Sequence, residues 1–294
     1  MEESILTIIL ITYNHKNTIA KCIESILNQK TNYKYEIHIT DDASTDGTSD
    51  ICREYGEKYP DRIKLFIQKE NTINNPPETH HVCQAYGRIS TKYWCYIEGD
   101  DYYSSENNLQ VLIEKLEEHP ECYTSAHNTI RKNADGTEQL IVDEKFKEGI
   151  YRPFEIPYVH PTGRIHRTIK GMWKYGLQGD ALIYYYFQSK GLTYYINKAM
   201  SVYNYNNLGV WTSLSSRIQN RQYRLSPFRL CQYTNFENEK CWRNLLIKKD
   251  RQMVTFFSFF IGTKLAWYLW YIVKFVPDFG WDSIDPYKAK RKKK

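Results

Sequence analysis

The sequence predicts an α/β fold, in which a mostly parallel β-sheet is flanked by helices, followed by a C-terminal helical extension. Strand and helix patterns alternate four times before residue 121, and the first strand is a continuous run of apolar and β-branched residues. The last third has aromatic and basic residues where that repeat would continue. We therefore place one domain at residues 1–216 and the extension at residues 217–294.

Each predicted strand is an apolar run, and each predicted helix has apolar residues at helical spacing. The first strand, ILTIILIT, has the composition of a strand buried on both faces, as in a parallel sheet. The four strands are predicted at residues 5–12, 35–42, 63–68 and 93–101, and the helices at 17–29, 49–60, 78–90 and 107–120. After residue 133 we predict a hairpin turn at ADGTEQ, a helix at 179–191 and one or two strands at 192–206.

The composition favours a cytosolic enzyme. Seven cysteines are scattered without a Cys-x-x-Cys pair, which indicates reduced thiols without metal-ligand spacing. The first residues, MEESILTIILITYN, have no basic segment before the apolar run, so we expect no signal peptide. The net charge of +6 comes with a basic tail but no recognisable nucleic-acid module, so we expect no nucleic-acid partner.

Two groups of carboxylates follow predicted strands. Asp41 and Asp42 end the second strand, and Glu98, Asp100 and Asp101 end the fourth. In open α/β sheets, ligands bind outside the carboxyl ends of the strands. These acids therefore indicate a binding site, although a polar turn after each strand is the simpler alternative.

Five segments in order resemble family 2 glycosyltransferases, which have the Rossmann-like GT-A fold. They are TIILITYNHKNTIAKCIESILNQ, YEIHITDDASTDGTSDI, YWCYIEGDDYYSSENNLQ, GLQGDALIYYYF and MSVYNYNNLGVWTSLS, and together they cover roughly residues 5–216. The resemblance implies sugar transfer from a nucleotide-sugar, commonly a UDP-sugar, with inversion at the anomeric carbon. It also implies a divalent cation, Mn²⁺ or Mg²⁺, which hard oxygen ligands suit.

The resemblance also implies roles for individual residues. Tyr13, between Thr12 and Asn14 in the nucleotide-contacting turn, would pack on the nucleobase, and Asp42 would pair with its uracil edge. Asp41 would support Asp42 or the adjacent turn. Asp100 would meet the ribose and the metal, and Asp101 would be the principal metal ligand. Asp180 would be the catalytic base, since a lone carboxylate at a helix start suits that task; a first-turn or capping acid is the alternative.

The sequence departs from the family pattern at two places. Glu98 stands where many relatives have Asp. Asn204 and Asn206 stand at positions where relatives often have Arg and His, so the metal or diphosphate site would include Asn206 in place of His, with Trp211 and Thr212 as further diphosphate contacts. His160, Arg164 and Arg167 are candidates for the acceptor or phosphate sites, with a structural or surface role as the alternative. We interpret His80 and His81 as loop residues.

The C-terminal segment 253–276 is rich in aromatic residues and precedes the basic tail 288–294. This pattern favours a helix lying in a membrane interface, with a packed helical pair or a spanning helix as alternatives. We expect the chain to be peripheral on the inner face of the cytoplasmic membrane, with a saccharide or lipid-linked glycan as acceptor and a possible homo-oligomer. The alternative functions are a sugar nucleotidyltransferase, or a catalytically impaired, membrane-bound scaffold that binds nucleotides.

Overall fold

A computed structural model describes residues 3–73, 75–76, 78–172, 177 and 179–205. The chain divides into two compact units, Met1–Ser213 and Leu214–Lys294, and every described residue lies in the first. The predicted membrane-interface extension at 217–294 therefore lies outside the described residues. Within the described part, no helix is both long and apolar enough to span a bilayer.

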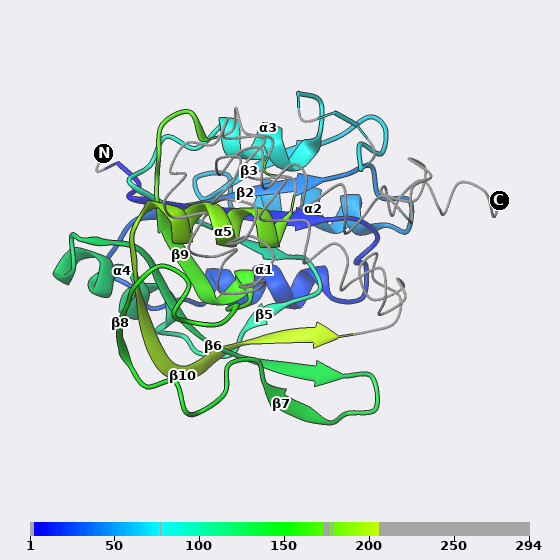
Figure 1. The fold of residues 1–294 in the computed structure, drawn as a ribbon. Helices are drawn as coiled ribbons and strands as arrows, with labels where there is room; N and C mark the ends of the chain where they lie inside the picture. Colours follow the sequence, from blue (N-terminus) through cyan, green and yellow to red (C-terminus); the bar gives the residue numbers. More distant parts are fainter. Residues whose placement is uncertain (1–2, 74, 77, 173–176, 178, 206–294) are drawn as a thin grey trace, which may run out of the picture. The chain divides into compact units, whose positions relative to one another are not determined.

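One ten-stranded sheet organises the described unit (Figure 1). All four predicted N-terminal strands are present and pair in parallel, in the order β3-β2-β1-β4. The sheet continues through β9, β6, β10 and β5, and β9 runs antiparallel to both β4 and β6. The strands are β1 Leu6–Thr12, β2 Tyr35–Asp41, β3 Ile63–Ile67, β4 Tyr93–Glu98, β5 Tyr102–Tyr103, β6 Cys122–Asn133, β7 Glu138–Leu140, β8 Gly149–Tyr151, β9 Arg164–Arg167 and β10 Leu192–Tyr205.

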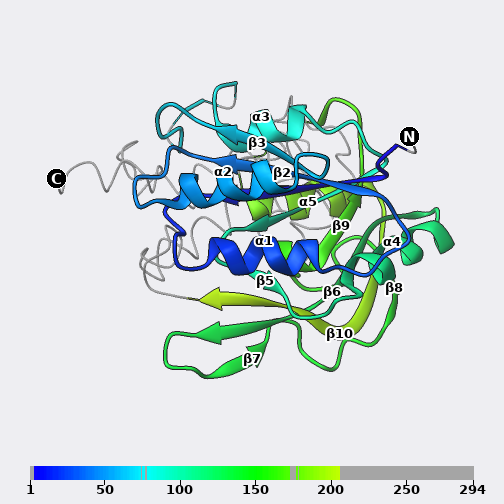
Figure 2. The same ribbon diagram turned by 180° about the vertical axis from the view of Figure 1, so that it is seen from behind.

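Helices cover both faces of this sheet. α1 and α2 lie in front of it in Figure 2, whereas α5 lies in front of it in the opposite view of Figure 1. The predicted helices are all present, with the bounds α1 Ile19–Leu27, α2 Thr48–Lys58, α3 His81–Gly87, α4 Asn108–Glu118 and α5 Asp180–Lys190, and a short 3₁₀-helix, η1, covers Pro161–Gly163. The mostly parallel α/β prediction is confirmed for this unit.

Strand β4 is buried on both faces, which explains its unbroken apolar sequence. Tyr93, Cys95 and Ile97 belong to the core beneath α1 and α4. On the other face, the Trp94 ring lies 5.2 Å from Tyr86 of α3 and 5.7 Å from Phe187 of α5. Full burial of each large side chain stabilises the fold by about 1.5–3 kcal/mol. This packing fixes where β4 ends, and therefore where its terminal acids lie.

The later part of the unit follows the weaker sequence signals. β6 and β7 form the predicted hairpin, and Gly136 supplies the positive φ of 83° at its turn. Residues 192–205 form one long strand, β10, whose pairing with β6 is interrupted by irregularities near Ile196 and Ala199. This strand returns the chain to the fourth-strand acids, as described below.

Candidate active site

Parallel pairing brings the ends of three strands together. Thr12 of β1 lies opposite Asp41 of β2, and Ile11 lies opposite Glu98 of β4. Asp42 N–H donates to the carbonyl of Thr12 at 3.0 Å, which continues the alignment past the strand ends. Both predicted acidic groups therefore lie at one edge of the sheet.

The loops after β1 and β2 are joined by hydrogen bonds. Asn14, at a positive φ of 56°, accepts from the backbone N–H of Thr45 at 2.8 Å, and its own N–H donates to Ser44 Oγ at 2.9 Å. His15 N–H donates to Thr48 Oγ1 at 2.8 Å. Tyr13 remains 40% exposed, so its ring is open to a ligand. Asn14 thus shapes the turn that presents Tyr13.

Asp41 is fully buried and supports its own turn, the second of the two roles expected for it. One oxygen accepts from the Ser44 hydroxyl, and the other accepts from Ser44 N–H at 3.2 Å and from Ser49 Oγ at 2.5 Å. Both oxygens therefore have protein donors. Its inclusion among the nucleotide-binding residues stays a prediction.

Asp42 is 1% exposed, and hydrogen bonds from the part of the chain that the structure describes reach only one of its two carboxylate oxygens. Its Oδ1 accepts from Thr72 N–H at 2.8 Å and Thr72 Oγ1 at 2.7 Å, and His81 Nδ1 lies 3.2 Å away. Among the described residues, no hydrogen bond reaches Oδ2. Burial opposes the charge, but the bonds from His81 and Thr72 outweigh it and lower the pKa of Asp42. A fixed, ionised carboxylate with a free oxygen suits recognition of an N–H group.

Thr72 and His81 are site residues that the sequence interpretation missed. His81 is the first residue of α3 and His80 is its N-cap, so their interpretation as loop residues was wrong. Thr72 Oγ1 lies 2.8 Å from His81 Nδ1, and the two together enclose Asp42 Oδ1. The available signal was a His at a helix start next to an apolar run, which is too common to single out.

The lowered pKa of Asp42 predicts a specific acid sensitivity. Because the folded state favours the ionised form, this stabilisation is present above the unfolded pKa, about 4, and is lost as the pH falls through the lower folded value. In Asp42→Asn, the free energy of unfolding should therefore decrease less between pH 5 and pH 3, as measured by urea titration at each pH. Asp61→Asn, at an exposed position, should keep the wild-type pH dependence. If the stability of Asp42→Asn depended on pH as the wild type does, Asp42 would not be the source of this acid sensitivity.

The acids after β4 have three different environments. Asp101 is 1% exposed; its Oδ2 accepts from Thr162 Oγ1 at 2.8 Å, and its Oδ1 accepts from Asn204 N–H at 3.1 Å. Burial, and then the charges of Asp100 and Glu98, raise its pKa well above the usual range. Asp101 therefore ties η1 and β10 to the site. Its expected role as the principal metal ligand stays a prediction.

Asp100 is the carboxylate with an unused oxygen. Its Oδ1 is buried and has no hydrogen-bond partner in the described part of the chain, and its Oδ2 lies 3.9 Å from His15 Nε2. The side chain of Glu98 is exposed, but the protein around it reduces the hydration of the carboxyl group. This desolvation, followed by the charges of Asp100 and Asp180, raises the pKa of Glu98 to about 8. A cation bound here would offset the repulsion between these carboxylates. The described residues contain no cluster of three or more ligands, but Mg²⁺ and Mn²⁺ bound with phosphates need only one or two carboxylates.

Gly99 allows the β1 loop to approach the acidic residues. A Cβ atom at this position would lie 2.7 Å from Thr12 Oγ1 and 2.8 Å from His15 Nδ1. Thr12 is buried, and its Oγ1 lies 3.2 Å from His15 Nδ1, so it orients His15 and does not face the open site. His15 is a second site neighbour that the sequence interpretation missed.

Gly99→Ala is expected to displace Thr12 and His15. Overpacking of this kind costs about 1–3 kcal/mol, and the displaced loop carries Tyr13, so UDP binding should weaken as well. Thermal unfolding and UDP titration would measure the two effects. Gly87→Ala is a matched control, because a Cβ there would meet nothing within 4 Å. A wild-type melting temperature in Gly99→Ala would contradict the predicted contact.

Asp180 lies in the first turn of α5, after the N-cap residue Gly179. Its Oδ1 accepts from Ala181 N–H at 2.7 Å, and its Oδ2 accepts from the Tyr158 hydroxyl. Asp180 also raises the pKa of Glu98, so its charge lies near the acids after β4. The role of Asp180 as base stays a prediction. Tyr158 was not predicted.

The remaining candidates in this region have structural contacts. The His160 ring stacks on Tyr203 at 4.2 Å, and its Nδ1 lies 3.1 Å from Thr162 Oγ1. Burial lowers the pKa of His160 well below its usual range, so the ring is neutral. Arg167 donates to backbone carbonyls, including that of Cys122 at 2.7 Å. Arg167 is half-buried, and its predicted contact with phosphate stays a prediction.

Comparison with known proteins identifies the family. Residues 7–170 match the family model described as Glycosyl transferase family 2. The chain belongs to this family. The resemblance inferred from the five segments is therefore confirmed.

Relatives of this family 2 member match less than half of the chain. The putative glycosyltransferase EpsE of Bacillus subtilis is 38% identical over 115 residues, 39% of each chain. Abequosyltransferase RfbV of Salmonella typhimurium is 30% identical over 113 residues, 38% of this chain and 32% of that protein. An uncharacterized protein of Mycobacterium bovis is 30% identical over 122 residues, and the chain spans only 34% of its length.

Solved structures share the fold over more of the chain. TarS 1-349 of S. aureus, in complex with UDP, has a TM-score of 0.57 at 16% identity and covers 82% of this chain and 70% of its own. The mannosyltransferase PcManGT from Pyrobaculum calidifontis, in complex with GDP-Man and Mn²⁺, has a TM-score of 0.50 at 14% identity, covering 98% and 86%. These likenesses confirm the GT-A-like fold.

Part of the predicted site lies beyond the described residues. Asn206, Trp211 and Thr212, predicted for the metal and the diphosphate, belong to residues 206–294, which the structure does not describe. Asn204 is described, and its side-chain amide donates to the backbone carbonyl of Asp100. At the position where relatives often have Arg, this chain therefore uses an amide to hold the acidic turn.

Proposed function

We propose that this chain is an inverting, metal-dependent glycosyltransferase that moves a sugar from a nucleotide-sugar, preferentially a UDP-sugar, to a saccharide or lipid-linked saccharide in polysaccharide assembly. The observation that carries the proposal is the strand register that places the two acidic groups, Asp41–Asp42 and Glu98–Asp101, at one edge of the sheet. The charge of Asp180, the candidate base, also acts on Glu98. The names of the relatives support the reaction class.

The donor would bind across the strand ends. The exposed ring of Tyr13 would pack on the nucleobase, and the free Oδ2 of Asp42 would accept from its N–H edge. Asp100 and Glu98 would hold the cation, whose positive charge would stabilise the diphosphate leaving group. Asp101 would keep the turn in place through Thr162 and Asn204. We thus assign the principal ligand to Asp100 in place of Asp101.

Asp180 would act on the acceptor. An inverting transfer needs a base on the face of the sugar opposite the leaving group. Asp180 would take the proton from the acceptor hydroxyl while that oxygen bonds to the anomeric carbon and the bond to the diphosphate breaks. A carboxylate in the first turn of a helix is stabilised in its charged form by the helix dipole.

The test is nucleoside diphosphate release from a panel of UDP-, GDP- and TDP-sugars, with and without saccharide acceptors, in Mn²⁺, Mg²⁺ or EDTA. The proposal expects acceptor-dependent release that EDTA abolishes and that is largest for a UDP-sugar. Tight nucleotide binding without turnover for any donor would instead support the scaffold alternative. Release of pyrophosphate from a nucleoside triphosphate and a sugar phosphate would support a nucleotidyltransferase.

We also propose peripheral membrane binding through residues 217–294, because their aromatic and basic residues fit a membrane interface. Co-sedimentation with vesicles rich in anionic lipid, compared with vesicles of neutral lipid, would test this. Binding should decrease with salt and with substitution of the lysines in the tail 288–294. Equal recovery with and without vesicles would contradict it.

A further inference from the structure

Arg164 is an arginine without an ordinary partner. It lies in β9, is 2% exposed, and none of its three guanidinium nitrogens has a hydrogen-bond partner among the residues that the structure describes. A buried charge is costly unless it is paired, and arginine keeps its charge in proteins. Neither of the roles expected from the sequence, a phosphate contact or a solvated surface residue, fits this position.

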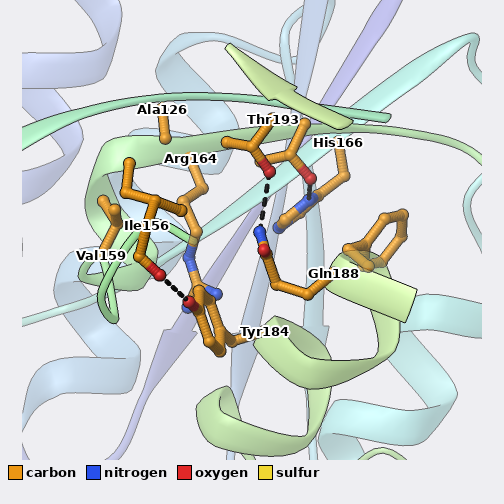
Figure 3. Close-up of a pocket in the computed structure, with 10 residues that line it drawn as sticks. Ala126, Ile156, Val159, Arg164, His166, Tyr184, Gln188 and Thr193 are labelled. Atoms are coloured by element: carbon orange, nitrogen blue, oxygen red, sulfur yellow. Dashed lines mark hydrogen bonds between the residues drawn. The ribbon is translucent and has the colours of Figure 1, made fainter. Parts of the chain in front are cut away.

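The surroundings of Arg164 are aromatic and closed. Figure 3 shows its side chain extending from β9 to the ring of Tyr184 on α5. The guanidinium carbon lies 5.4 Å from the Tyr158 ring centroid and 5.6 Å from that of Tyr184, within the range of cation–π attraction. The space between the surrounding side chains does not admit a water molecule. An anionic ligand therefore has no room to pair with Arg164 here.

The same tyrosines connect Arg164 to the candidate base. The Tyr158 hydroxyl donates to Asp180 Oδ2. The Tyr184 hydroxyl donates to the carbonyl of Ile156 at 2.8 Å, which holds the segment that carries Tyr158, and the two rings pack edge to face at 5.4 Å. Arg164, Tyr158 and Asp180 thus form one connected line from β9 to the first turn of α5.

The charges in this region oppose one another. Burial raises the pKa values of Tyr86 and Tyr96 well above the usual range; the charges of Asp180 and Glu98 add to that increase, and the charge of Arg164 reduces it. His166 lies beside Arg164 and is neutral, since burial and then Arg164 lower its pKa. Arg164 therefore supplies positive charge to the region that contains Asp180 and Glu98. The low dielectric constant of this buried region strengthens the interaction of that charge with its neighbours.

We propose that Arg164 and Tyr158 are positioning residues for Asp180. The cation against the Tyr158 ring withdraws electron density and makes the hydroxyl a stronger donor, and that hydrogen bond orients the Asp180 carboxylate. A carboxylate oxygen accepts more than one hydrogen bond, so Asp180 can still receive the acceptor's proton. This inference depends on the proposed role of Asp180 as base.

The test uses Tyr158→Phe, Arg164→Met and Arg164→Lys in the full chain. In Tyr158→Phe and Arg164→Met, kcat should fall by about 10- to 100-fold, the effect of one hydrogen bond to a charged group, with the donor KM unchanged. The acid limb of the kcat–pH profile should move to higher pH, because losing a donor to the carboxylate favours its protonated form. Arg164→Lys should restore part of the rate. Tyr151→Phe is the control, since its hydroxyl donates to the carbonyl of Lys147, away from Asp180.

A second measurement does not require turnover. The Asp180 carboxyl resonance, assigned by comparison with Asp180→Asn, would be titrated by ¹³C NMR in the wild type and in the Tyr158→Phe and Arg164→Met variants. The expected result is a higher apparent pKa in both variants. An unchanged pKa with a lower melting temperature would overturn the inference and leave a purely structural role. If the Asp180 pKa is higher in both variants but the wild type transfers no sugar, the proposed function is refuted and the positioning of Asp180 is not.

Discussion

Asp180→Asn is expected to abolish sugar transfer while leaving nucleotide-sugar binding and folding intact. The amide oxygen can still accept from Ala181 N–H, and the amide NH₂ can donate to the Tyr158 oxygen, so the helix start should be preserved. It cannot take a proton from the acceptor hydroxyl. General-base catalysis typically contributes about 10²–10⁴-fold, and kcat should fall by that amount. The proposed donor contacts, Tyr13, Asp42 and Asp100, are not among the hydrogen-bond partners of Asp180.

The measurements are kcat with a saturating donor, UDP affinity by calorimetry, and the melting temperature. Asp135→Asn, an exposed aspartate in the β6–β7 hairpin, is the control for loss of one carboxylate and should behave as the wild type. Unchanged transfer in Asp180→Asn would exclude Asp180 as the base. A large fall in UDP affinity would show that Asp180 contributes to donor binding instead.

Asp100→Ala is expected to lose metal-dependent UDP binding but keep its stability, whereas Asp101→Ala is expected to lose stability. Asp100 has a buried oxygen without a partner and lies next to two other acids, so its removal should preserve or slightly increase the free energy of unfolding. It should also remove the Mn²⁺ dependence of UDP binding and nearly all transfer. Asp101→Ala leaves the N–H of Asn204 and the hydroxyl of Thr162 without an acceptor, which should cost about 1–3 kcal/mol of stability.

Urea unfolding and UDP titration with and without Mn²⁺ separate these outcomes, and the two variants serve as matched controls for each other. If Asp101→Ala unfolds like the wild type but loses Mn²⁺-dependent binding, then Asp101 is the ligand and the assignment to Asp100 is wrong. If neither variant changes the effect of Mn²⁺, the cation is held elsewhere.

The fold of the strand-and-helix repeat could be predicted because its signals are local. The β-branched run of β1 and the apolar sequence of β4 both report burial on two faces, and the order of the elements then fixes where their ends meet. Asp42 and the acids after β4 follow from the same rule. Asp180 required the family resemblance, because one acid at a helix start is common in any protein.

The division of roles within the site could not be predicted, because it depends on residues distant in the sequence. Asp100 and Asp101 are adjacent and chemically identical, and only the donors from Thr162 and Asn204 distinguish them. Thr72 and His81 lie 30 or more residues from Asp42 in the chain, and nothing in their local sequence indicates that they meet it. Arg164 was a candidate for a phosphate contact or for a solvated surface position, since arginine is rarely buried without a partner.

The bond between Asp101 and Asn204 has a consequence for how the protein is made. The two residues are separated by 103 positions, and at roughly 5 to 20 residues per second the ribosome needs on the order of 5 to 20 s to add that length. During that interval β1 to β4 can already pair, whereas the Asp101 carboxylate still lacks the partner that β10 brings. The nascent chain therefore passes through a stage in which β1 to β4 are paired but the acidic turn is incomplete, and this turn gains its Asn204 contact only when β10 arrives.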